Sequence, residues 1–342
     1  MMSQSERYKI VPHMETYHTD FYKVITPYLT LFHQANFRSD FVNTDSTGFR
    51  FSYLGDTRID NHSWWQQENR CIAVGGSFVF SEGATSDHHT LVSNLNELTQ
   101  SSFINLGIKG GNSTQELIAT IPFIANTEKA VICSGMNNLV ASLQSTGKNE
   151  LFGPLFSEGL IDKLANYSIS NLVRRASFDE VGTVLLAKML LARIRTTLTR
   201  KKRGEKKFRT TNVQNKYQAL TKAVEWTQRD LRIMARSLPN SASIYFVMQP
   251  FASASTKQLT PQEQHLFGLT DNLAGSHWKT LKNDLVELWP TYTREIKQMC
   301  SEYGIFFIDL NNHEFTDWAY VDRVHMTDQG YFQAAQFIAK EL

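Results

Sequence analysis

The fold is indicated most clearly by Cys71-Ile72-Ala73-Val74-Gly75-Gly76-Ser77, a short apolar run that ends in two glycines and a serine. A short apolar run bounded by turn residues is typical of a strand that is buried on both faces. The two glycines predict a sharp turn directly after this strand. Such a turn would expose the hydroxyl of Ser77 at the carboxyl end of the strand.

Further apolar runs along the chain also predict strands, and helical stretches separate several of them. We expect strands at residues 103–106, 130–133, 244–248 and 305–308, and helices at 90–98, 113–120 and 331–342. Short apolar strands that alternate with helices are typical of a parallel sheet covered on both faces. The sequence therefore predicts an α/β protein, a three-layer α/β/α sandwich with a central, mostly parallel five-stranded sheet of flavodoxin-like type.

The expected sandwich spans residues 71–342, and residues 1–70 form an N-terminal extension packed on it. Within the extension, residues 17–37 are rich in aromatic side chains and are interpreted as helical, with Pro27 starting or kinking the helix. Residues 151–239 interrupt the alternation and are predicted to be a helical insertion. Their stretches 178–198 and 216–238 carry apolar residues at helical spacing.

Composition favours an ordinary globular protein over a disordered or nucleic-acid-binding one. The chain has 342 residues, 42% of them hydrophobic and 20% charged, with a net charge of +2. This charge is too balanced to indicate a nucleic-acid partner. The three cysteines are widely spaced and fit neither a disulfide framework nor a zinc site, so Cys71 and Cys133 are expected to be buried free thiols.

Location and surface contacts are indicated only weakly. Residues 1–11 lack the apolar segment of a signal peptide, and no stretch approaches the length of a membrane span, so we expect a cytoplasmic protein. A non-classical export route stays open. The basic run at residues 200–209 is interpreted as a solvated loop, and the alternative is contact with an anionic surface such as lipid headgroups, nucleic acid or an acidic polymer.

Candidate catalytic groups follow the predicted strands. Asp322-Arg323-Val324-His325 brings an acid and an imidazole together within one tight turn. With Ser77, these side chains can supply a nucleophile, its base and the group that orients the base. Gly110 follows the second strand and Asn137 the third. Because the carboxyl ends of parallel strands lie at one edge of a sheet, we expect all these residues to meet there.

At these positions the sequence resembles the SGNH (GDSL-like) hydrolase superfamily, over about residues 71–342 apart from the insertion. The four blocks that carry the resemblance are residues 73–83, 105–110, 135–138 and 322–325. The resemblance implies that Ser77 is the nucleophile, His325 its base and Asp322 the third member of the triad. It also implies that the backbone N–H groups of Ser77 and Gly110 and the side chain of Asn137 stabilise an oxyanion.

Two positions depart from the family pattern. The family has an aspartate directly before the serine, where this chain has Gly76, and an aspartate where this chain has Asn138. The first aspartate is not a member of the triad, so its loss does not remove the chemistry. The second change could alter the loop that holds Asn137 but leaves Asn137 in place.

Three functions remain open from the sequence. The first is a serine hydrolase that cleaves an acyl or acetyl ester of a carbohydrate or small metabolite through an acyl-enzyme. The second is an O-acyltransferase or O-acetyltransferase that uses the same triad. The third is a non-catalytic binding or regulatory protein on this fold. No cofactor or metal is expected, and neither the acyl length nor the oligomeric state is indicated.

Lys109, Asn138 and His88 are weaker candidates for substrate binding. Lys109 directly precedes Gly110 and could attract an anionic acyl group or sugar. His88 follows Ser77 closely enough to line a pocket, although an exposed position is the alternative. Asp87-His88-His89 does not have the spacing of a metal site.

Overall fold

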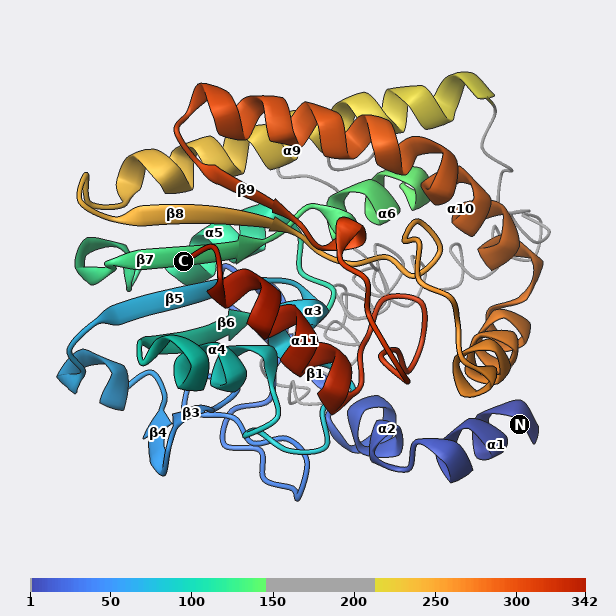
Figure 1. Cartoon of the computed structure of the whole chain (residues 1–342), viewed down its shortest axis with the longest axis horizontal. Helices are drawn as coiled ribbons and strands as arrows, with labels where there is room; N and C mark the ends of the chain where they lie inside the picture. The colour runs from blue at the N-terminus through green and yellow to red at the C-terminus, as the bar shows by residue number, and fades with distance from the viewer. Residues whose placement is uncertain (1, 146–212) are drawn as a thin grey trace, which may run out of the picture. The chain divides into compact units, whose positions relative to one another are not determined.

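The central feature of the computed structural model, which describes residues 2–145 and 213–342, is a five-stranded parallel sheet (Figure 1). Its strands are β5 (Arg70–Gly75), β6 (Ser102–Gly107), β7 (Lys129–Cys133), β8 (Ser243–Met248) and β9 (Phe306–Asp309). They lie in the order β6-β5-β7-β8-β9, and every neighbouring pair is parallel. This is the flavodoxin-like order, in which the connection reverses direction between β5 and β7.

Both faces of the sheet are buried, because alternate residues of each strand enter different apolar clusters. Ile72, Ile104 and Phe246 face one cluster, with α5 (Ser113–Thr120), α6 (Met136–Gln144), α9 (Val213–Ser237) and α10 (Pro261–Glu302). Ala73 and Val131 face the other, with α4 (Leu91–Thr99) and α11 (Asp328–Ala339). Helices α9 and α10 and helices α4 and α11 lie on opposite sides of the sheet (Figure 1). The predicted α/β/α sandwich is therefore confirmed.

Capping side chains fix where several helices begin. Thr90 accepts a hydrogen bond from the backbone of Ser93 at α4, and Asn112 forms a capping box with Gln115 at α5. Thr260 caps α10 in the same way, with Pro261 as its first residue. Helix α10, 42 residues long, has no counterpart among the sequence-based predictions, since Pro290 interrupts an otherwise helical pattern.

The N-terminal extension is built differently from the sequence-based expectation. It contains α1 (Met2–Ile10), α2 (His13–Glu15), the π-helix η1 (Thr16–Asp20), the hairpin β1 (Lys23–Thr26) and β2 (Thr30–His33), a second hairpin β3 (Ser52–Leu54) and β4 (Thr57–Ile59), and η2 (Ser63–Gln66). The helix expected over residues 17–37 is wrong beyond Asp20. Residues 23–26 carry three β-branched side chains in a row and residues 30–33 begin with a fourth, and Pro27 lies in the turn between the two segments.

The predicted insertion is only partly described. Helix α9 matches the helix expected at residues 216–238 and contacts α5, α6 and α10. Residues 178–198 and the basic run at 200–209 lie outside the described residues. Two short 3-10 helices, η3 (Ile124–Asn126) and η4 (Leu310–Asn312), complete the described elements.

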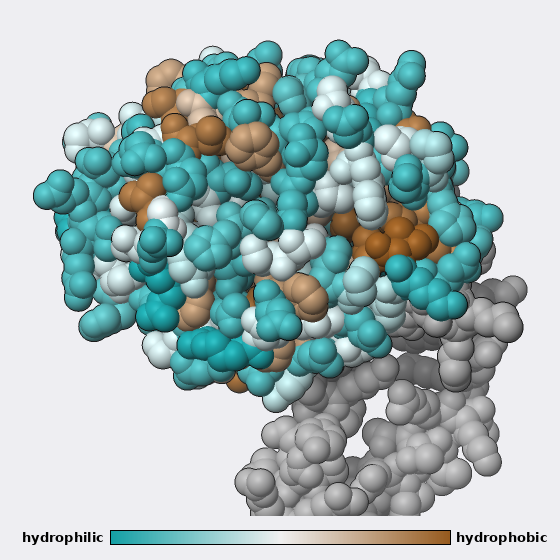
Figure 2. All heavy atoms as spheres, turned by 60° about the horizontal axis from the view of Figure 1, so that its bottom comes forward, coloured by the Kyte–Doolittle hydropathy of each residue, from teal (hydrophilic) through white to brown (hydrophobic). Residues whose placement is uncertain are grey.

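The described surface is mainly hydrophilic on the face drawn in Figure 2, where apolar side chains gather in separate patches. No helix in residues 2–145 and 213–342 combines the length and the apolar character that crossing a membrane requires. The cysteines Cys71, Cys133 and Cys300 are buried free thiols, as expected for the first two.

Candidate active site

Ser77 lies at the first position of α3 (Ser77–Phe80), directly beyond the carboxyl end of β5. The helix ends after one turn at Ser81, whose φ of 62° is left-handed. Arg50, fully buried, donates to the carbonyl oxygens of Phe80 and Ser81 at 3.0 and 2.9 Å. The same guanidinium pairs with Asp87 at 2.7 Å. Arg50 therefore fixes the end of the short helix that carries Ser77.

Ser77, His325 and Asp322 form a continuous chain of hydrogen bonds. Nε2 of His325 lies 2.8 Å from Oγ of Ser77, and Nδ1 of His325 lies 3.0 Å from Oδ2 of Asp322. The first of these contacts joins positions that are 248 residues apart in the sequence. The geometry matches that of a serine nucleophile, its base and an orienting carboxylate.

Asp322 is held on both of its oxygens. Oδ1 accepts the backbone N–H groups of Val324 and His325 at 3.0 and 2.9 Å, which keeps the Asp-x-x-His turn tight. Oδ2 also accepts from Arg7 of α1 at 3.0 Å in a buried ion pair. Burial alone would raise the pKa of Asp322, but His325 and then Arg7 outweigh it and hold the pKa well below its ordinary value.

A second carboxylate, that of Glu82, lies on the other side of the imidazole. Its Oε2 is 3.6 Å from Nε2 of His325, and its Oε1 is 3.4 Å from both Lys109 and His18. Burial disfavours the imidazolium, but Asp322 and then Glu82 outweigh this effect, so the pKa of His325 is raised. His325 is thus able to hold a proton between two carboxylates.

The loop after β6 is braced by a neutral histidine. Nε2 of His33 accepts the backbone N–H of Lys109 at 3.0 Å, and its Nδ1 lies 3.1 Å from the carbonyl oxygen of Gly48. Burial, reinforced by Lys109 and Lys23, lowers the pKa of His33 well below its ordinary value. The neutral ring therefore donates from Nδ1 and accepts at Nε2, which fixes the backbone next to Gly110.

Backbone donors are free beside Ser77. Gly110 has a left-handed φ of 63°, a conformation that glycine adopts at little cost. Within the described ranges, the N–H groups of Ser77 and Gly110 donate to no protein acceptor. Both residues are half-buried, as expected of donors that await a ligand.

The side chain of Asn137 lies beside the turn that carries Ser77. Its Nδ2 donates to the carbonyl oxygen of Gly111 at 2.7 Å, which leaves the second N–H of the amide for another acceptor. A Cβ atom at Gly76 would lie only 2.7 Å from this Nδ2. The glycine that replaces the aspartate of the family pattern therefore gives the amide of Asn137 room beside Ser77.

The weaker candidates lie in different surroundings. Asn138 is buried, and its side-chain amide forms hydrogen bonds with Ser113 and Thr227. Because these bonds join α5, α6 and α9, they favour a structural role for Asn138. His88 is exposed and stacks on Tyr53, with ring centroids 3.9 Å apart. Asp87 forms an ion pair with Arg50. Within the described part of the chain, no three side chains of the types that ligate metals lie together.

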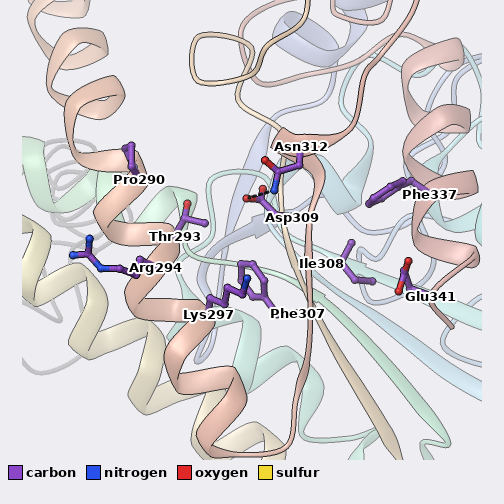
Figure 3. A pocket seen from close by; sticks show the side chains of 10 residues that line it. All are labelled: Pro290, Thr293, Arg294, Lys297, Phe307, Ile308, Asp309, Asn312, Phe337 and Glu341. Atoms are coloured by element: carbon purple, nitrogen blue, oxygen red, sulfur yellow. Dashed lines mark hydrogen bonds between the residues drawn. The ribbon is translucent and has the colours of Figure 1, made fainter.

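A separate pocket of about 460 Å³ lies along the edge strand β9, between α10 and α11 (Figure 3). Its lining mixes apolar, basic and acidic side chains, including Arg294, Lys297, Asp309 and Glu341. None of the candidate site residues contributes to it. We therefore base the functional argument on the hydrogen-bonded chain at Ser77.

Four residues of this region carry no role in the sequence-based prediction. Arg7, His33 and Arg50 come from the N-terminal extension and reach the site only through the fold. Glu82 lies in the first family block, five residues after Ser77. This short spacing was the one feature of the sequence that could have indicated a contact between Glu82 and the site.

Comparisons with known proteins found only distant structural similarities. No protein-family model matches the sequence, and no curated protein matches it either. Among solved structures, the extracellular lipase of Streptomyces rimosus has 11% identity over 79% of this chain and 97% of its own, with a TM-score of 0.41. Phospholipase A1 of Streptomyces albidoflavus NA297 has 10% identity over 79% of this chain and 97% of its own, with a TM-score of 0.41.

The structure of a carbohydrate acetylesterase family member from Sinorhizobium meliloti is similar to this chain to about the same degree. It has 11% identity over 79% of this chain and 95% of its own, with a TM-score of 0.38. Identities this low concern the fold alone, and TM-scores this low support no statement about activity. The strand order and the four sequence blocks at the strand ends remain the grounds for the resemblance to SGNH hydrolases.

Proposed function

We propose that the protein is a serine hydrolase that cleaves an acyl or acetyl ester of a carbohydrate or small metabolite. The observation that carries the proposal is the 2.8 Å contact between Nε2 of His325 and Oγ of Ser77, continued by the 3.0 Å contact between His325 and Asp322. A hydroxyl becomes a useful nucleophile when an adjacent base can take its proton. Here the base is itself oriented by a buried carboxylate.

In the first half of the reaction, Nε2 of His325 takes the proton of Ser77 while Oγ attacks the ester carbonyl carbon. The carbonyl oxygen becomes an oxyanion, and the N–H groups of Ser77 and Gly110 and the amide of Asn137 stabilise it. His325 then gives the proton to the leaving alkoxide, which departs as an alcohol. Ser77 is left as an acyl ester.

In the second half, water takes the position of the departed alcohol. His325 removes a proton from the water, whose oxygen attacks the acyl carbon and again forms an oxyanion. The bond between the acyl carbon and Oγ then breaks, His325 returns the proton to Oγ of Ser77, and the carboxylic acid leaves. Asp322 stays ionised throughout, because Arg7 and two backbone N–H groups hold its charge. Its part is to orient His325 and to stabilise the imidazolium.

The test is covalent labelling by a fluorophosphonate followed by turnover of short acyl esters. We expect one adduct per wild-type chain, on Ser77, and none on Ser77→Ala or His325→Ala. Ser86→Ala, a half-buried serine on the following loop, is the matched control and should label like wild type. A folded Ser77→Ala protein with full esterase activity would refute the proposal.

A further inference from the structure

Two lysines lie together beside the loop that precedes Gly110. Lys23 on β1 pairs directly with His33 on β2 across the first hairpin. Side chains of directly opposed residues project from the same face of a hairpin. The ring of His33 contacts the backbone N–H of Lys109 at 3.0 Å, so this face of the hairpin is the one that meets the loop. Lys23 therefore projects toward Lys109.

The two ammonium groups differ in how they are paired. Lys109 donates to the carbonyl oxygen of Tyr17 at 2.8 Å and lies 3.4 Å from Glu82. Lys23 is half-buried, and residues 2–145 and 213–342 provide it with no ion pair or hydrogen-bond acceptor. Burial and then the charge of Lys109 lower the pKa of Lys23 to about 8. A cation in this position is unfavourable unless an anion compensates it.

No side chain of the site supplies that anion. The charge of Glu82 acts on Lys23, but Lys109, His18 and His325 already surround this carboxylate at 3.4 to 3.6 Å. Asp322 is matched by Arg7 and His325. Both carboxylates of the site are thus paired with other cations, and the positive charge of Lys23 has no carboxylate of its own.

Lys109, whose charge acts on Lys23, is connected to Ser77 by a short series of contacts. From Lys109 the contacts run through Glu82 to His325, at 3.4 and 3.6 Å, and from His325 to Ser77 at 2.8 Å. The lysines therefore lie within reach of a group on the same small substrate whose ester meets Ser77.

We propose that Lys23, supported by Lys109, forms a subsite for a negatively charged group of the substrate, a carboxylate or a phosphate, next to the ester that is cleaved. The inference rests on the proposed function and narrows it to anionic esters. Because Lys109 is anchored to Tyr17 and Glu82, it serves as a fixed wall of the subsite. Lys23 supplies the uncompensated charge.

The experiment compares kcat/KM for neutral and anionic esters of matched reactivity. One arm places the charge on the acyl part, with 4-nitrophenyl benzoate against 4-nitrophenyl 4-carboxybenzoate, whose para carboxylate cannot reach its own ester. The other places it on the alcohol, with O-acetylated galactose against O-acetylated galacturonate and O-acetylated galactose 6-phosphate, which separates a carboxylate from a phosphate. We expect wild type to prefer the anionic member in at least one arm.

The variants assign that preference to Lys23. Lys23→Met should lower the ratio of anionic to neutral kcat/KM by about tenfold, and Lys23→Glu should lower it further. Added salt should reduce the wild-type ratio, since it screens the attraction. The control is Lys340→Met, at an exposed position after α11, which should keep the wild-type ratio.

The results that would overturn the subsite differ from those that would overturn the esterase proposal. Equal turnover of neutral and anionic esters by wild type would overturn the subsite and leave the esterase proposal standing. A preference that survives in folded Lys23→Met would also overturn it. If wild type neither labels with fluorophosphonate nor cleaves any ester, the proposed function fails and the subsite falls with it.

Discussion

Glu116 on α5 offers a sharp test of how well the buried charges of this fold are understood. Its side chain is buried, and its Oε2 has no hydrogen-bond partner within the described residues. Burial raises the pKa of Glu116 from 4.5 to about 8, with Ser134 opposing the shift and Asp230 adding to it. At neutral pH the folded protein therefore holds this group as an uncharged acid, whereas the unfolded chain ionises it.

The sign and size of the effect follow from linkage. Because the folded pKa is raised, the stability linked to Glu116 is fully present below about pH 4.5 and is lost as the pH rises toward about 8. At pH 7 the folded protein must keep Glu116 protonated, and this lowers the free energy of unfolding by about 3 kcal/mol. The loss amounts to about 1.4 kcal/mol for each pH unit above 4.5. Glu116→Gln keeps the shape of the side chain but does not ionise.

The assay is urea unfolding of wild type and Glu116→Gln at pH 5 and pH 7.5. The free energy of unfolding of the variant relative to wild type should rise with pH, by about 2 to 3 kcal/mol across this interval. The exposed Glu128→Gln is the matched control and should show no such trend. A difference that stays constant with pH would refute the reasoning, because Glu116 would then be charged in the folded protein.

Three further predictions concern the site. Glu82→Gln should shift the acidic limb of the kcat/KM profile to lower pH, because the pKa of His325 falls when a neighbouring carboxylate is removed; an unshifted limb would contradict this. Gly76→Ala should lower kcat by about 10 to 100-fold through displacement of Asn137, with Gly268→Ala, at an exposed and open position of α10, as the control for folding and activity. Arg50→Met should destabilise the protein by about 3 kcal/mol or more, measured by thermal unfolding, because it leaves buried acceptors unpaired; a loss below 1 kcal/mol would argue against that role.

The sheet could be predicted because each central strand leaves a strong local signal. The residues of β5, β6 and β7 form short apolar runs, since both faces of these strands are buried. The hairpin of β1 and β2 could not be separated from a helix in the same way. Aromatic residues occur in both kinds of element, and the β-branched run Val24-Ile25-Thr26 directly before Pro27 was the signal that decides for strands.

The candidate site divides along similar lines. Ser77, Asp322 and His325 could be predicted because their chemistry requires short motifs at the ends of strands. Arg7 and His33 could not, because their partners are 315 and 76 residues away in the sequence. A lone arginine or histidine carries no local signature of what it will contact. Their roles as supports remain predictions until the triad itself has been tested.

The separation of Ser77 from His325 also sets the order in which the molecule acquires its reactive group. A chain is synthesised from its N-terminus and can begin to fold during synthesis. The serine is made 248 residues before the imidazole that contacts it. During that interval the hydroxyl has no base, and the nascent protein is as unreactive as any chain with an ordinary surface serine. On the proposed mechanism, chemical competence therefore arrives late, when Asp322 and His325 have been made and have docked against Arg7 and Ser77.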